Sequence, residues 1–170
     1  MEDKGFAVDR EMQVVAFKVG REDFGVDVKK VEGVISMVDI TRMPRAPQFV
    51  EGIINLRGQI VAVVNLANRL GIESTERGAA TRIVVVEAQD VKVGLVVESP
   101  EVLNIDQEDI EASPMLATSD VNTSFILGVV KLGDRLLILL DVDRVLSDEE
   151  RTDIGEIDMS TVAETKEEEQ

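Results

Sequence analysis

FVEGIINLRGQIVAVVNLANRL, residues 49–70, aligns without a gap with FILGVVKLGDRLLILLDVDRVL, residues 125–146. In both segments an apolar run leads into a tight polar turn, and a second apolar run is followed by a short helical stretch. The turns read RGQ at 57–59 and GDR at 133–135, which is the composition of β-hairpin turns. The repeat therefore predicts an internal duplication, with a hairpin and a helical turn ending each half.

A weaker repeat lies upstream of each copy. FGVDVKKVEGVI from Phe24 resembles VGLVVESPEVLN from Val93. Each half then holds about five strands separated by turn signals, which is typical of a small barrel. The runs at 60–64 and 136–140 show no polar alternation, so both faces of these strands should be covered, each barrel by the other. The predicted fold is mainly β, with two five-stranded SH3-like barrels related by duplication.

Composition and connectors divide the chain into four parts. Five Phe and no Trp or Tyr leave Val, Ile, Leu and Ala to build the core, a mixture that suits strands. We expect an N-terminal extension at 1–12, a first barrel at 13–80, a second barrel at 81–148, and an acidic, partly disordered tail at 149–170. SDEE from Ser147 has the form of a capping box, which predicts a short C-terminal helix.

Several kinds of chemistry are missing from the chain, which contains no Cys and no His. Disulfides, zinc–thiolate sites and cysteine nucleophiles are excluded, together with the usual general base and a phosphohistidine. Without any phosphate-binding or catalytic motif, we expect no catalytic residue, no metal and no cofactor. The alternative is an enzyme that holds a divalent metal on carboxylates. A solvated acidic surface explains the carboxylates of the second half better, namely Asp106, Glu108, Asp109 and Glu111.

The formal net charge of −16 argues against a nucleic-acid partner, because phosphate contacts need clustered Lys and Arg. The charge is unevenly distributed. Residues 13–82 hold ten basic and eight acidic side chains, whereas residues 83–146 hold four basic and twelve acidic ones. The split serves solubility or brings a basic first barrel against an acidic second one in head-to-tail self-association. No signal peptide and no membrane-spanning run is found, so a cytoplasmic location without membrane insertion is expected.

The segment ITRMPRAPQFVEGIINLRGQIVAVVNL, residues 40–66, resembles the most specific motif of the CheW-like family of chemotaxis coupling proteins. With its flanks, the resemblance covers residues 12–148. It implies two SH3-like barrels packed around a shared apolar interface. It also implies a stand-alone, non-catalytic adaptor that is recruited to chemoreceptor arrays at the membrane. Its partners would be the cytoplasmic signalling tip of a chemoreceptor and the regulatory domain of a CheA-type histidine kinase. A related protein serving a receptor pathway other than motility is an open alternative.

The resemblance also implies a receptor-binding site in the groove between the barrels, where a receptor helix would bury its i, i+3, i+4, i+7 face. In the family, the Arg that matches Arg57 is tied to receptor coupling. A rigid hairpin would hold this guanidinium in one geometry, suited to forked hydrogen bonds. The candidate residues for this site are Val28, Val31, Gly52, Asn55, Arg57 and Gly58.

A structural role for Arg57 is an equally weighted alternative, in which its guanidinium pairs with an acid inside the barrel. The family commonly has a Glu where this chain has Gly33, and here Glu32 comes one residue earlier. In a strand, a shift by one residue moves a side chain to the opposite face. This departure puts a family-type pair between the carboxylate and Arg57 in question.

Overall fold

The computed structural model describes residues 11–46, 48–111 and 125–145. Strands dominate, as the β-branched composition predicts. The elements in chain order are β1 (Glu11–Val19), β2 (Glu22–Asp27), η1 (Val28–Lys30), β3 (Val31–Ser36), β4 (Val50–Leu56), β5 (Gln59–Val64), α2 (Leu66–Leu70), β6 (Thr81–Ala88), β7 (Val91–Asp106), η2 (Gln107–Asp109), β8 (Ile126–Leu132), β9 (Arg135–Leu140) and α3 (Val142–Val145).

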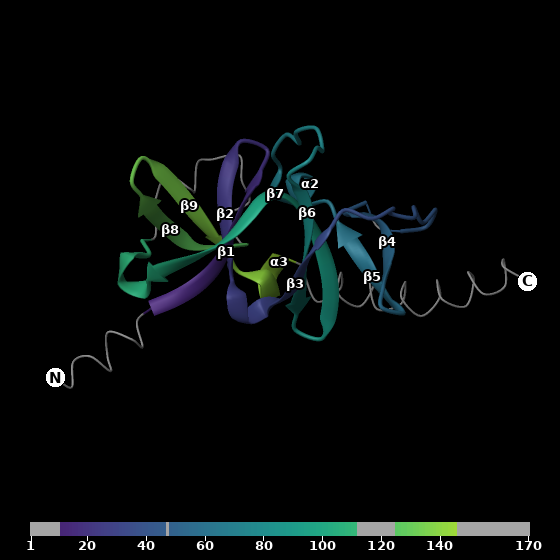
Figure 1. Cartoon of the computed structure of the whole chain (residues 1–170), viewed down its shortest axis with the longest axis horizontal. Coiled ribbons are helices and arrows are strands. Elements are labelled where there is room, and N and C mark those ends of the chain that lie inside the picture. Colours follow the sequence, from purple (N-terminus) through teal and green to yellow (C-terminus); the bar gives the residue numbers. More distant parts are fainter. Residues whose placement is uncertain (1–10, 47, 112–124, 146–170) are drawn as a thin grey trace, which may run out of the picture.

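The strands form two barrels that share β7 (Figure 1). Barrel A consists of β1, β2, β8, β9 and the second half of β7, and barrel B consists of β3, β4, β5, β6 and the first half of β7. Each barrel contains one parallel pair, β2 with β9 and β5 with β7. Within the described residues, each barrel therefore has five strands, which confirms the predicted mainly β fold.

The barrels do not follow the predicted division at residue 80. Strands β1 and β2, from the first half of the chain, pair with β7 and β9 from the second half. Strand β3 in turn pairs with β6, and β5 pairs with β7. The two halves thus exchange their first strand pairs, because β7 continues as one strand from barrel B into barrel A. Turn signals locate strands but do not select their partners.

The ends of the chain also differ from the expected boundaries. Glu11 and Met12, assigned to an N-terminal extension, already belong to β1. The helical turns expected at the end of each copy are confirmed as α2 and α3. The helix predicted from Ser147 and the tail at 149–170 lie outside the described residues.

Apolar side chains form three clusters that explain the continuous apolar runs. One cluster fills barrel A, a second fills barrel B, and a third forms a central layer between them. On β5, Val61 and Val63 point into barrel B, whereas Ala62 and Val64 join the central layer. Strand β9 repeats this alternation with Leu137 and Leu139 inside barrel A and Ile138 and Leu140 in the central layer. Both faces of these strands are covered as predicted, although Leu136 at the edge stays 56% exposed.

Gly52 and Gly128 occupy equivalent bulges and allow each barrel to close. A Cβ at Gly52 would lie 2.4 Å from the Thr41 carbonyl oxygen, and one at Gly128 would lie 3.0 Å from the Glu111 carbonyl oxygen. At these places the chain adds a short antiparallel bridge, Thr41 to Ile53 and Glu111 to Val129. The bare glycine backbone therefore permits the closing contact in both copies.

Replacing Gly52 by Ala should destabilise the protein by about 1–3 kcal/mol, because the new methyl group would overpack the closing bridge. Urea unfolding of the variant measures the change. Gly33→Ala is the matched control in β3, since nothing lies within 4 Å of a Cβ there. Equal stability of the Gly52 and Gly33 variants would contradict the role assigned to Gly52.

Candidate partner-binding site

The β4–β5 hairpin ends in a two-residue turn formed by Arg57 and Gly58. Both residues have positive φ, 55° and 84°, as in the type I′ turn whose twist matches that of paired strands. Leu56 and Gln59 face each other across the turn, and the Asn55 side-chain oxygen accepts a hydrogen bond of 2.9 Å from the Gly58 amide. The turn is thus held by its own side chain, and Arg57 projects from it as an exposed residue.

Below the turn, the hairpin is anchored in the core. Ile54 and Val61 face each other across the two strands, and both are buried in barrel B. Leu56 packs against the same cluster beside the turn. The backbone that carries Arg57 is therefore fixed, although the residue itself lies on the surface.

No described residue forms an ion pair or hydrogen bond with the Arg57 side chain. Glu32, which stands one residue before the family's Glu position, is instead the extra residue of a bulge in β3. It pairs with Lys92, and its carboxylate lies 3.3 Å from the Lys92 ammonium. The same ammonium donates to the Gln59 side chain at 3.3 Å. Lys92 thus links β3 to the β4–β5 hairpin and is the ion-pair partner of the Glu32 carboxylate. The internal acid pair weighed for Arg57 is not found in the described part of the chain.

The six predicted residues fall into two groups. Asn55, Arg57 and Gly58 come together in the exposed hairpin turn. Val28 in η1 and Val31 in β3 are half-buried and pack against the central layer, outside this turn. Gly52 is buried below the Thr41 carbonyl, where it serves barrel closure. The turn is therefore the exposed part of the candidate site.

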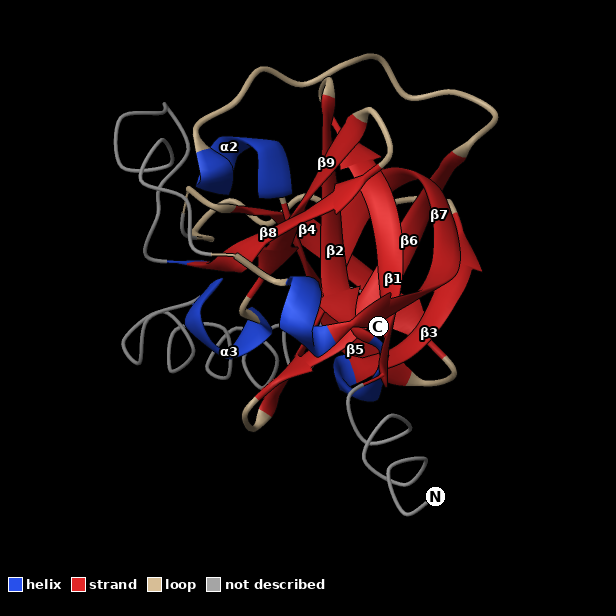
Figure 2. Ribbon diagram, turned by 90° about the vertical axis from the view of Figure 1, so that its left-hand side faces the viewer, coloured by secondary structure: helices blue, strands red, loops and turns tan. Residues whose placement is uncertain are grey.

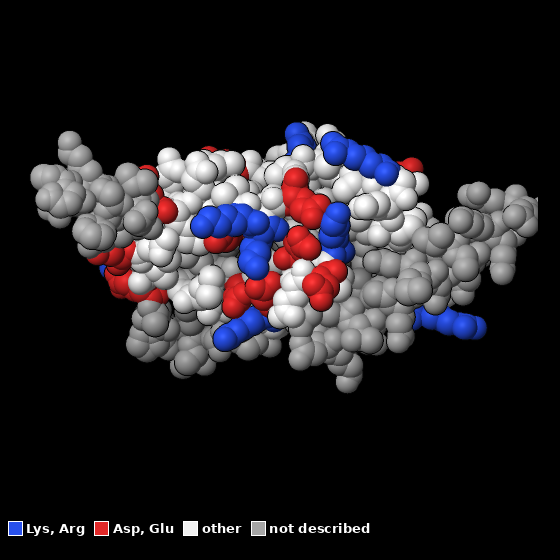
Figure 3. Space-filling model, turned by 90° about the horizontal axis from the view of Figure 1, so that it is seen from below, with Lys and Arg blue, Asp and Glu red and all other residues white. Residues whose placement is uncertain are grey.

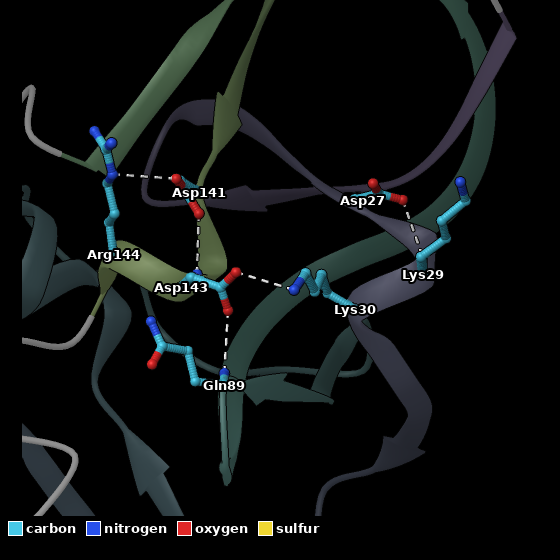
Figure 4. A network of polar contacts seen from close by, with 7 residues as sticks. All are labelled: Asp27, Lys29, Lys30, Gln89, Asp141, Asp143 and Arg144. Carbon is cyan, nitrogen blue, oxygen red and sulfur yellow. Dashed lines mark hydrogen bonds and ion pairs between the residues drawn. The ribbon is translucent and has the colours of Figure 1, made fainter. Parts of the chain in front are cut away.

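A polar network around α3 was not foreseen from the sequence (Figure 4). The Asp143 carboxylate accepts hydrogen bonds from the Lys30 ammonium at 2.9 Å and from the Gln89 amide at 3.1 Å. Its own amide donates to the Asp141 side chain at 3.1 Å. Acceptance by Asp143 raises the pKa of Lys30 above its ordinary value. Since α3 follows barrel A while Gln89 lies in the β6–β7 turn of barrel B, Asp143 joins the two barrels.

The internal repeat contained a signal for this network. Asp143 stands where the first copy has Ala67, a buried residue of α2. A carboxylate at the position of a buried Ala marks a break in the duplication.

Basic and acidic side chains lie close together over the middle of the face drawn in Figure 3. Charges on that face are therefore intermixed, and no single sign dominates its centre.

Residues 13–150 match the sequence model of the CheW-like domain. The chain belongs to the CheW-like family. The Thermotoga maritima chemotaxis protein CheW is 37% identical over 82% of this chain and 90% of its own length. The chemotaxis proteins CheW of Rhizobium meliloti and Treponema pallidum are 34% and 31% identical over 82% and 84% of this chain, and 90% and 86% of their own lengths.

A solved CheW-like structure has the same fold. The crystal structure of the scaffolding protein TtCheW from Thermoanaerobacter tengcongensis matches with a TM-score of 0.74 and 34% sequence identity, over 82% of this chain and 90% of the other. The exchange of strands between the barrels therefore belongs to a fold seen in a solved CheW-like protein. The expected family and fold are both confirmed.

Two further findings bear on what this CheW-like chain can do. In the described ranges, no group of three or more acidic side chains is placed to hold a metal ion. None of the helices in those ranges has the length and apolarity that crossing a membrane requires.

Arg57→Asn should raise stability by up to about 1 kcal/mol. An Arg with positive φ is strained, whereas the Asn-Gly pair is the most favoured sequence for a type I′ turn. Thermal or urea unfolding measures the gain. A clear loss of stability would instead show that the guanidinium holds the CheW-like fold together.

Proposed function

We propose that this protein is a non-catalytic scaffold that couples the cytoplasmic tips of chemoreceptors to a CheA-type histidine kinase in chemotaxis. Relatives named chemotaxis protein CheW and a solved relative titled a scaffolding protein support this proposal. The observation that carries it is the β4–β5 turn, where Arg57 is exposed on a rigid backbone without an acidic partner among the described residues.

The turn offers groups suited to recognising a helical hairpin of a receptor. A guanidinium can donate paired hydrogen bonds to carboxylates or to backbone carbonyls, and its planar fork fixes their geometry. Arg57 is the proposed anchor, with Asn55 and Gly58 shaping the turn beside it. Val28, Val31 and Gly52 contribute by supporting the surface, because they are half-buried or buried. The protein acts in the cytoplasm and joins receptor arrays through these contacts.

The test is a pull-down with a chemoreceptor signalling tip and, separately, with a kinase regulatory domain. Arg57→Glu and Arg57→Asn should weaken receptor binding by about tenfold or more, because a binding anchor is lost. Binding of the kinase domain should stay unchanged. Lys131→Glu is the control, since Lys131 is an exposed cation of the β8–β9 hairpin, two residues before Gly133, which is the position equivalent to Arg57.

Melting curves show whether each variant is folded, so that loss of binding can be assigned to the contact itself. Receptor binding by the Arg57 variants at the level of the wild type would refute the anchor. Absence of binding by the wild type to both partners would refute the scaffold. Equal losses with the Lys131 control would mean that charge in general, and not the position of Arg57, controls binding.

Self-association is a second element of the proposal, supported by how charge is shared between the barrels. The described residues of barrel B with α2 and its connectors, 28–97, hold nine basic and seven acidic side chains. Barrel A with η2 and α3 holds five basic and thirteen acidic side chains in its described residues, 11–27, 98–111 and 125–145. Despite the exchange of strands, one barrel is mildly basic and the other is acidic. Opposite signs at the two ends favour head-to-tail contacts.

Sedimentation velocity at low and high salt tests this element. At low salt the average sedimentation coefficient should rise with protein concentration, and added salt should return the protein to monomer because it screens the attraction. A monomer at every concentration in low salt would rule out self-association while leaving the receptor and kinase contacts standing.

A further inference from the structure

Arg69 of α2 lies between two aromatic rings that come from different barrels. Its guanidinium carbon is 5.7 Å from the ring centre of Phe49, the residue before barrel B's β4. It is 4.9 Å from the ring centre of Phe125, the residue before barrel A's β8. Its Nε donates a hydrogen bond of 2.8 Å to the carbonyl oxygen of Val145 in α3. One side chain therefore contacts both barrels and both short helices.

The internal repeat explains why these groups meet. Phe49 and Phe125 are equivalent positions of the two copies, and so are Arg69 and Val145. The backbone carbonyl of each Phe accepts a hydrogen bond from the amide of the residue before the helix of its own copy. The Asn65 amide donates to Phe49 at 3.0 Å, and the Asp141 amide donates to Phe125 at 2.7 Å. The helices α2 and α3 lie on the same side of the molecule (Figure 2). The guanidinium thus lies where the two copies face one another.

At the equivalent positions 69 and 145 the two copies have to carry different residues. Two Arg side chains would put like charges between the same pair of rings, whereas two Val side chains would leave the rings without a cation and the α3 carbonyl without its donor. A single guanidinium can lie against both aromatic faces at once. It also adds a positive charge at the carbonyl end of α3, where a cation is favourable. The chain has one Arg and one Val, which is the combination that these constraints allow.

We infer that Arg69 is a clamp that holds the two barrels in one relative orientation. The surroundings of the clamp are formed by equivalent groups from both copies, so the guanidinium can act from either copy. An Arg at position 145 would reach the same two rings, with the carbonyl of residue 69 as its acceptor. The clamp lies within the chain, so it acts whatever partners the scaffold has.

The test compares the wild type with Arg69→Val, Val145→Arg and the double exchange. Arg69→Val should lower the folding equilibrium constant by about tenfold or more, since two cation–π contacts and a hydrogen bond are lost. Val145→Arg should also lower it, because two cations then compete for one place. The double exchange should recover to within about threefold of the wild type. Urea unfolding measures all four proteins.

Orientation is measured directly with spin labels, which is convenient because the chain has no native Cys. Ser36→Cys in β3 and Lys131→Cys in β8 place one label on an exposed position of each barrel. The distance distribution between the labels should broaden in Arg69→Val and narrow again in the double exchange. Lost stability without any change in the distribution would show that Arg69 stabilises the fold but does not orient the barrels.

A stability loss in the double variant equal to the sum of the two single losses would overturn the clamp. So would an Arg69→Val variant that is as stable as the wild type. Should both single variants fail to fold, recovery of a folded protein in the double exchange would support the clamp, and failure of the double exchange as well would overturn it.

Discussion

The apolar layer between the barrels is the constraint on which the rest of the structure depends. Strands β1, β5, β6 and β9 turn one face into their own barrel and the other into this layer. Neither barrel can be removed without exposing residues such as Phe17, Val64 and Leu140, which are almost fully buried. Burial of this much apolar surface is the main favourable term in folding. The two barrels therefore form one folding unit with a fixed geometry.

Strand exchange strengthens this dependence. Because β7 runs through both barrels and β1 and β2 leave their own half of the chain, backbone hydrogen bonds as well as side chains cross the boundary. A scaffold that holds two partners in one arrangement benefits from such a structure, since a flexible link between barrels would let the partners move independently. Rigidity of the whole is what gives the surface hairpins their defined positions.

The duplication supplies two equivalent frameworks, and the copies differ in the charged side chains that they carry. The two hairpins have the same register and the same length, yet one turn presents Arg57 and the other presents Asp134. Between the barrels, Ala67 of the first copy is replaced by Asp143, and Arg69 is replaced by Val145. These differences place a cation at an exposed tip and a network of charges between the barrels. Divergence after duplication has thus changed side chains while the backbone stays equivalent.

The family departure at Glu32 has a structural explanation in the same terms. A bulge in β3 accommodates the earlier carboxylate, and Lys92 from β7 binds it. Exposed ion pairs of this kind contribute little stability, so their effect lies in where they direct the groups involved. Here the effect is that the Glu32 carboxylate pairs with Lys92 and not with Arg57.

Local features of the chain were determined by the sequence alone. The 76-residue repeat, the hairpin turns, the helical turns and the double burial of β5 and β9 follow from periodicity and turn chemistry, which act over a few residues. The tertiary structure decided which strands pair across the halves and which charges meet. Lys30 and Asp143 are 113 residues apart, and no local pattern selects one such partner from many similar ones. Those choices depend on the packing of the central layer, which exists only once the chain has folded.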